Sequence, residues 1–113
     1  MSCLFCRIVA GEIPGDRVYE DADMVAFTDI KPAAPMHVLI VPREHIPTVN
    51  ALTPEHDRLI GAMQRRAASL AAERGFAESG FRTVVNCNPA AGQTVFHLHM
   101  HVLAGRSLSW PPG

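Results

Sequence analysis

Three histidines at alternate positions are the feature that most constrains the fold of this chain. The segment VFHLHMHVLAG, residues 95–105, contains His97, His99 and His101, which are three of the six histidines in the sequence. Side chains at i, i+2 and i+4 point to one face of a β-strand, whereas a helix would distribute them around its axis. The spacing therefore predicts a strand over residues 95–103 with one imidazole face.

The other face of this predicted strand is apolar. Phe96, Leu98, Met100 and Val102 alternate with the histidines. A strand of this pattern turns its apolar side toward the core. The histidine face is then expected to line a site.

The first half of the chain predicts a short helix and three strands. Residues 4–12 form the expected helix, which Gly11 closes. Residues 17–21 and 24–29 have the composition of two short strands. The run from His37 to Pro42 is continuously apolar after its first residue and predicts a central strand.

The second half predicts a long helix followed by two strands. Thr53 is the expected N-cap, Pro54 the first helical residue and Gly75 the stop. One apolar face of this helix is made of Leu59, Ile60, Met63, Ala67 and Leu70. Residues 81–86 predict the strand that precedes the histidine strand. The order of helix, three strands, helix and two strands predicts an α+β fold with a largely antiparallel sheet.

Length and charge limit the classes of function. At 113 residues, the chain is expected to form one domain over residues 1–113. Its net charge of −1 gives no basic field for a nucleic-acid polymer. Neither an export signal nor a membrane span is evident, so a cytoplasmic location with reduced thiols is expected.

The histidine face allows three interpretations. It could be the polar side of a half-buried strand, or it could hold a catalytic zinc ion, because neutral imidazoles are good metal ligands. It could also carry an imidazole nucleophile whose neighbours donate hydrogen bonds to a phosphate. In the third interpretation His99 attacks, because it has a histidine on each side.

Polar residues near the predicted strand favour the phosphate interpretation. Gly92, Gln93 and Thr94 precede the strand, and Asn86 closes its neighbour. Taken singly, each of these residues is ordinary in a loop. Together with the histidines they predict a phosphate cradle.

The cysteines raise a separate question. Cys3 and Cys6 could be a redox pair, half of a zinc site or two incidental thiols, whereas Cys87 lies outside any pair. A redox pair normally follows a strand, and none is predicted before this one. A tetrahedral zinc needs two further ligands, for which His45 and His97 are the candidates.

The segment AGQTVFHLHMHVL resembles the signature of the histidine triad (HIT) family. The resemblance extends to CLFCRIVAGEIP, to AFTDIKPAAPMHVLIVPREHI and to the C-terminal WPPG. This last segment is similar to the Hint-like branch, whose members hydrolyse purine nucleoside phosphoramidates. The resemblance implies a HIT-like fold and a homodimer with a ten-stranded sheet, in which the Trp110 tail reaches toward the partner's site.

The resemblance also implies a set of catalytic residues. His99 would form a transient nucleotidyl-histidine that water then hydrolyses. His101 and Thr94 would contact the α-phosphate, and Gln93 would lie near the leaving group. His37 would make a further phosphate contact.

The same resemblance implies a purine nucleotide site and a zinc site. Asn86 would contact the phosphate, and Asp29 would accept hydrogen bonds from the ribose hydroxyls. The purine slot would be formed by Phe5, Ile8, Ile13 and Ile30, although Ile8 is equally well explained as a core residue. A structural zinc, not required for catalysis, would be held by Cys3, Cys6, His45 and His97.

The leading functional hypothesis is hydrolysis of nucleoside 5′-phosphoramidates. Within the family, the alternative is a dinucleoside polyphosphate hydrolase, against which the WPPG ending argues. From other classes, the alternatives are a nucleotide-binding scaffold dimer with incidental hydrolysis and a metal-dependent hydrolase acting at the triad.

Overall fold

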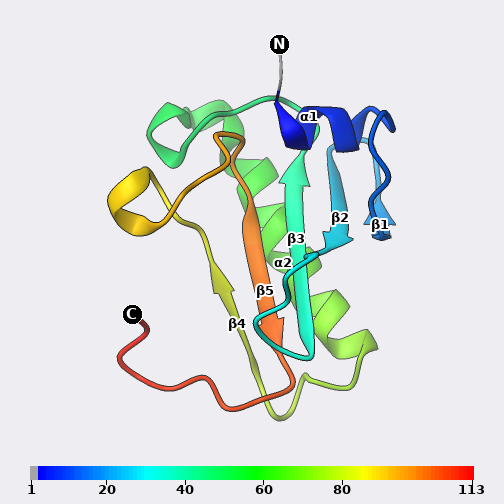
Figure 1. The fold of residues 1–113 in the computed structure, drawn as a ribbon, viewed down its shortest axis with the longest axis vertical. Helices are drawn as coiled ribbons and strands as arrows, with labels where there is room; N and C mark the ends of the chain where they lie inside the picture. The colour runs from blue at the N-terminus through cyan, green and yellow to red at the C-terminus, as the bar shows by residue number, and fades with distance from the viewer. Residues whose placement is uncertain (1–2) are drawn as a thin grey trace.

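The computed structural model describes residues 3–113, which form a single five-stranded sheet flanked by helices (Figure 1). The two α-helices and five strands are α1 (Leu4–Val9), β1 (Arg17–Glu20), β2 (Met24–Thr28), β3 (Met36–Pro42), α2 (Asp57–Glu73), β4 (Phe81–Val84) and β5 (Met100–Ala104). Three short 3₁₀ turns accompany them: Val49–Ala51, Pro54–His56 and Pro89–Ala91. Within residues 3–113, neither helix combines the length and apolar character that crossing a bilayer requires.

The sheet is antiparallel throughout, with strand order β1-β2-β3-β5-β4. The first three strands form a meander. The connection through α2 then places β4 at the far edge and inserts β5 between β4 and β3. This arrangement confirms the predicted α+β fold.

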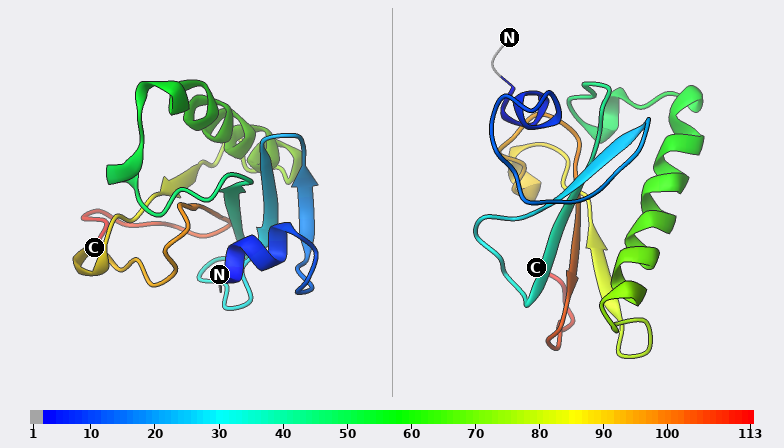
Figure 2. Two further views of the ribbon diagram at one scale, coloured as in Figure 1. Left: turned by 90° about the horizontal axis from the view of Figure 1, so that it is seen from above. Right: turned by 90° about the vertical axis from the view of Figure 1, so that its right-hand side faces the viewer.

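The two helices lie on opposite faces of the sheet (Figure 2). The long helix α2 covers the main core, to which Met63 and Ala67 of the helix and Ile40 and Val102 of the sheet belong. The short helix α1 lies over a smaller apolar cluster on the other face. That cluster contains Phe5, Ile8, Val25, Phe27, Leu39 and Val41.

Coverage of both faces explains why β3 has no polar alternation. All seven residues of β3 are buried, since even-numbered side chains face α2 and odd-numbered ones face the α1 side. His37 is the one polar side chain on this strand, and it is only 6% exposed. A buried imidazole needs hydrogen-bond partners, and His37 finds them in the Ala33 backbone and in His101.

The last strand is shorter than predicted. β5 begins at Met100, and residues 95–97 form bends. Leu98 donates its N–H to Ile46 in the loop after β3, at 2.6 Å, instead of extending the ladder. Leu98 is nevertheless 2% exposed and faces the main core, so the alternation of sides continues beyond the strand. The prediction that Phe96 faces the core is wrong, because this side chain is 43% exposed.

Other boundaries also differ from the predictions, and the first helix ends at Val9 instead of residue 12. β4 ends at Val84, so Asn86 lies in the following loop. The long helix begins with a 3₁₀ turn over Pro54–His56 before α2 starts at Asp57. The predicted stop is confirmed, since Gly75 has φ +85°, a conformation that favours glycine.

Replacing Ile40 tests the main core. Ile40 is fully buried, so we expect Ile40→Ala to lower the free energy of unfolding by about 3–4 kcal/mol through lost burial and a cavity. Ile30→Ala is the matched control, because Ile30 is 94% exposed and its truncation should cost under about 0.5 kcal/mol. Urea denaturation measures both, and equal losses would contradict this assignment of the core.

Candidate functional site

A cavity of about 630 Å³ opens on the face of the sheet that α1 covers. Its volume lies within the range of small-molecule sites. Its lining residues are Leu4, Phe5, Ile8, Ile13, Pro14, Gly15, Asp16, Phe27, Thr28, Asp29, Ile30, Leu39, Thr94, Val95, His99 and His101. The cavity thus brings together residues that are far apart in the sequence, and most of its wall is apolar.

Four of the lining residues are those expected to form an apolar slot. Phe5 and Ile8 are 5% and 7% exposed and also belong to the cluster under α1. Ile8 is therefore both a core residue and a wall of the cavity. Ile13 is partly buried, whereas Ile30 stands almost free in solvent at the cavity's edge.

The pairing of β3 with β5 places two histidines side by side. His37 is paired with Leu103 and Leu39 with His101, so the two imidazoles are diagonal neighbours on one face. His37 Nε2 lies 2.9 Å from His101 Nδ1. The backbone N–H of Ala33 donates to His37 Nδ1, also at 2.9 Å.

These two contacts set the tautomers of both rings. Since His37 Nδ1 accepts a hydrogen bond from Ala33, the neutral ring carries its proton on Nε2 and donates it to His101 Nδ1. His101 then carries its own proton on Nε2. The cavity therefore receives an imidazole N–H donor from His101.

Burial keeps both rings neutral. Desolvation lowers the pKa of His37, although the nearby Asp29 carboxylate acts in the opposite direction. Desolvation and the neighbouring His99 and His37 lower the pKa of His101 to about 4. At neutral pH, the His101 ring is thus an uncharged hydrogen-bond donor.

His99 has the opposite tautomer. Its Nδ1 lies 2.8 Å from the carbonyl oxygen of His97, to which only an N–H can donate. The lone pair is therefore on Nε2. The ring is 8% exposed, and the edge-on ring of Phe5 packs against it with centroids 5.0 Å apart. His99 thus offers an oriented nucleophilic nitrogen beside the donor N–H of His101.

Asp29 lies at the same group of rings. One carboxylate oxygen accepts from the Lys31 backbone N–H at 2.8 Å, and the other lies 3.4 Å from His37 Nε2. Asp29, His37 and His101 are close enough together to suggest a metal site. The hydrogen bond from Ala33 argues against one, because it places a proton on His37 Nε2 where a metal would need a lone pair.

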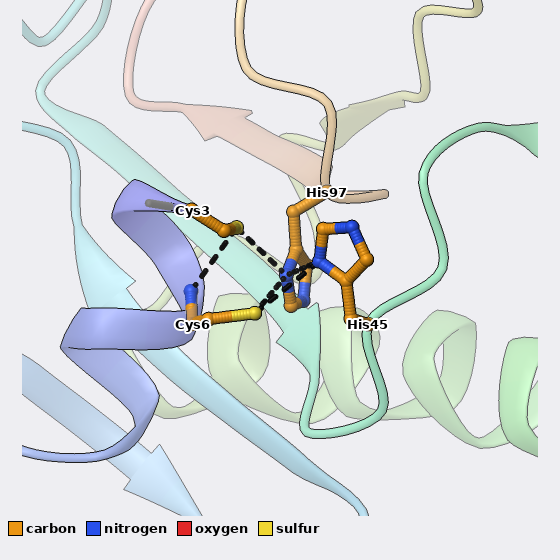
Figure 3. A group of neighbouring side chains, drawn as sticks. All are labelled: Cys3, Cys6, His45 and His97. Atoms are coloured by element: carbon orange, nitrogen blue, oxygen red, sulfur yellow. Dashed lines mark hydrogen bonds between the residues drawn. The ribbon is translucent and has the colours of Figure 1, made fainter. Parts of the chain in front are cut away.

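A second group of side chains meets beside the cavity (Figure 3). Cys3 and Cys6 come from the start of α1, His45 from the loop after β3 and His97 from the bend before β5. The four candidate ligand atoms all lie within 4.8 Å of one another. Burial and the neighbouring Cys3 raise the pKa of the Cys6 thiol, so a bound cation would be needed to hold the Cys6 sulfur as a thiolate.

His97 is fully buried and linked on three sides. Its Nε2–H donates to the Pro42 carbonyl at 2.8 Å, which leaves the Nδ1 lone pair directed at Cys3, Cys6 and His45. Burial lowers its pKa, which favours the neutral, ligating form. Its backbone carbonyl orients His99. His97 therefore connects the group of candidate metal ligands to His99.

Of the three loop residues expected near the phosphate, only one lines the cavity. Thr94 lines the cavity. Gln93 is 3% exposed and its amide is committed to the loop: it accepts from Asn88 N–H and donates to the carbonyls of Pro47 and Val95. Asn86 is partly buried and is not part of the cavity wall.

Sequence reasoning did not identify Ala33 as a functional residue. Its contribution is a backbone N–H, which leaves no trace in side-chain chemistry. The proline-rich context of the loop was the available signal, because prolines restrict the chain direction on both sides of Ala33. Asp16, which is also one of the lining residues, was not identified either.

Comparisons with known proteins agree with this geometry. A family model described as "Scavenger mRNA decapping enzyme C-term binding" matches residues 2–109. The purine nucleoside phosphoramidase of Escherichia coli K12 is 48% identical over 105 residues, which cover 93% of this chain and 88% of that protein. The chain belongs to the histidine triad family.

Solved structures of HIT proteins support the same assignment. A HIT family hydrolase from Legionella pneumophila Philadelphia 1 superimposes with a TM-score of 0.97 at 46% identity, covering 99% of this chain and 100% of that chain. A Zn-bound histidine triad protein from Mycobacterium smegmatis gives a TM-score of 0.82 at 39% identity, covering 94% and 76%. The family resemblance seen in the sequence is thereby confirmed.

The low pKa of His101 makes the stability of this HIT domain depend on pH. The unfolded chain takes up a proton on this histidine near pH 6.5, whereas the folded chain does so only near pH 4. Stability is therefore lost as the pH falls from about 6.5 to about 4. We expect His101→Gln to reduce this loss by about 1–2 kcal/mol, since partial solvent exposure weakens the full effect.

The measurement is urea denaturation of both proteins between pH 4 and 7.5, in identical buffers. The informative quantity is the difference between the two stability curves, because the other titrating groups affect both. Parallel curves would show that His101 does not titrate as described.

Proposed function

We propose that this protein hydrolyses nucleoside 5′-phosphoramidates through a nucleotidyl intermediate on His99. The observation that carries the proposal is the pair of opposite tautomers at the end of the cavity. His99 presents a lone pair on Nε2, and His101 presents an N–H. A phosphorus atom between them would meet a nucleophile and a donor for its oxygens.

In the first step, His99 Nε2 bonds to the α-phosphorus and the P–N bond to the amine breaks. The amine leaves with a proton taken from water. The His99 ring becomes positively charged as its second nitrogen is substituted, and the His97 carbonyl, which accepts from Nδ1–H, stabilises that charge. His101 and Thr94 at the cavity wall are suited to donate to the phosphate oxygens.

In the second step, water attacks the same phosphorus and the bond to His99 breaks. The nucleoside monophosphate is released and His99 regains its free Nε2. The sum of the two steps is addition of water across the P–N bond. The E. coli relative is named for action on purine nucleosides of this kind, which supports the choice of substrate.

The other lining residues fit the nucleoside part of such a substrate. Ile13 and Ile30, together with the buried rings of the α1 cluster, form an apolar slot for a purine. Asp29 follows β2 and faces the cavity, where its carboxylate can accept from the ribose hydroxyls. Gln93 would act by holding the loop, since its amide is already fully engaged.

We propose zinc as the ion for the group of Cys3, Cys6, His45 and His97. Tetrahedral zinc with ordinary bond lengths separates its ligand atoms by about 3.3 Å for two nitrogens and about 3.5 Å for nitrogen and sulfur. The two imidazole nitrogens here are 3.3 Å apart, and the nitrogen–sulfur distances are 3.2–3.4 Å. A solved HIT relative is described as Zn-bound. The ion would be structural, holding α1 against the bend before β5.

We further propose a homodimer. β4 forms one edge of the described sheet, so its outer hydrogen-bonding groups are available for a second copy. Pairing across a two-fold axis would give the ten-stranded sheet that the family resemblance implies. Trp110, 81% exposed in the tail, would then be free to approach the partner's cavity.

Replacing the nucleophile tests the reaction. With adenosine 5′-monophosphoramidate as substrate, we expect His99→Ala to lower AMP release at least about 1,000-fold while AMP binding changes little. His56→Ala is the matched control: His56 contacts Thr53 and Glu44, outside the cavity, and its loss should leave turnover within about twofold. A fully active His99 variant would contradict the proposal, and binding without turnover by the wild type would favour a scaffold.

Replacing the metal ligands tests the zinc site. Metal analysis should find about one zinc per chain in wild type and in Cys87→Ala, whose thiol lies outside the group. We expect Cys6→Ala and His45→Ala to lose the zinc and to unfold at lower temperature, because α1 loses its cross-link. Equal zinc content in Cys6→Ala and Cys87→Ala would reject the site, and another metal at full occupancy would reject zinc.

A further inference from the structure

We propose that Asp16 reads the purine base and makes this protein prefer guanine over adenine. The inference rests on the proposed function, because it assumes that a purine nucleotide occupies the cavity. It goes beyond that function by assigning a base preference to a residue that no family resemblance identified.

The order of the strands places Asp16 where the base is expected. His101 lies on β5, Asp29 follows β2, and Asp16 immediately precedes β1. In the strand order β1-β2-β3-β5, three spacings, or about 14 Å, separate the first and last of these positions. Phosphate, ribose and base extend in that same order along a nucleotide.

Backbone contacts show that these residues lie at one end of the sheet. Thr28 N–H donates to the Asp16 carbonyl, and Asp29 N–H donates to the His37 carbonyl, both at 2.9 Å. His37 in turn contacts His101. The three positions therefore follow one line across the floor of the cavity.

The segment that carries Asp16 is held firmly on both sides. A Cβ on Gly15 would lie 3.1 Å from a methyl carbon of Ile8, so the chain passes very close to α1 at this point. The next residue, Arg17, donates to the carbonyls of Ile8 and Val9 at the end of α1. The backbone that carries this carboxylate is therefore positioned before a ligand arrives.

The charge of Asp16 is available to a ligand. The neighbouring cation, Arg17, is committed to Glu20 and to the carbonyls at the end of α1. Asp16 is exposed and is one of the residues that line the cavity. A ligand edge rich in N–H groups would match it.

The two purines differ at that edge. A carboxylate only accepts hydrogen bonds, and guanine offers it two donors, N1–H and the 2-amino group. Adenine offers one donor, its 6-amino group, beside the N1 lone pair, which a carboxylate repels. Hypoxanthine has N1–H without the 2-amino group, so its affinity should be intermediate.

The experiment uses zinc-loaded full-length protein and calorimetric titration with GMP, IMP and AMP. We expect GMP to bind about tenfold more tightly than AMP, with IMP between them. The same order should appear in kcat/KM for the three 5′-phosphoramidates. Failure of all three nucleotides to bind would overturn the proposed function, whereas equal affinities for GMP and AMP would overturn only the role of Asp16.

Three variants make the test specific. Asp16→Ala should bring the three affinities within about twofold of one another. Asp16→Asn should reduce the preference, since an amide can both accept from and donate to either purine. Asp29→Asn, at the ribose position, should weaken all three nucleotides by a similar factor and preserve their order. Unchanged discrimination in both Asp16 variants would overturn the inference.

Discussion

The buried position of His97 is the constraint on which the rest of the site depends. One ring nitrogen donates to the Pro42 carbonyl, so the other is left with a lone pair among the cysteines and His45. Its own carbonyl fixes the proton of His99. Any movement of this residue would therefore disturb the end of β3, the position of α1 and the tautomer of His99 together. The connection between these parts is short, because His97 is fully buried and makes direct hydrogen bonds to its neighbours.

The sheet divides stability and chemistry between its two faces. The α2 face holds the main apolar core. The face under α1 combines a smaller apolar cluster with the imidazoles and the cavity. Alternate residues of β3 and β5 face opposite sides of the sheet. A substitution on either strand therefore changes contacts on one face and leaves those on the other face in place. This arrangement lets a small domain carry a polar site without interrupting its main core.

The sequence predicted the elements better than their ends. The period of two along residues 97–102 correctly placed the histidines on one side and Leu98, Met100 and Val102 on the other. It could not show that the strand starts only at Met100, because extended chain alternates whether or not a ladder pairs with it. Phe96 fits the alternation in the sequence but is exposed, because the chain bends at residues 95–97, before β5 begins.

Residue types and spacing by themselves determined the class of fold, the shared face of the histidines and the potential of Cys3 and Cys6 as ligands. Only the tertiary structure decided how those groups act. The backbone N–H of Ala33 and the carbonyl of His97 assign opposite tautomers to His101 and His99, which are chemically identical residues in the sequence. The physical reason is that a tautomer is set by the partner of each ring nitrogen. Here the first of those partners are backbone groups. Every residue has them, and only the fold determines which of them lie beside a given ring.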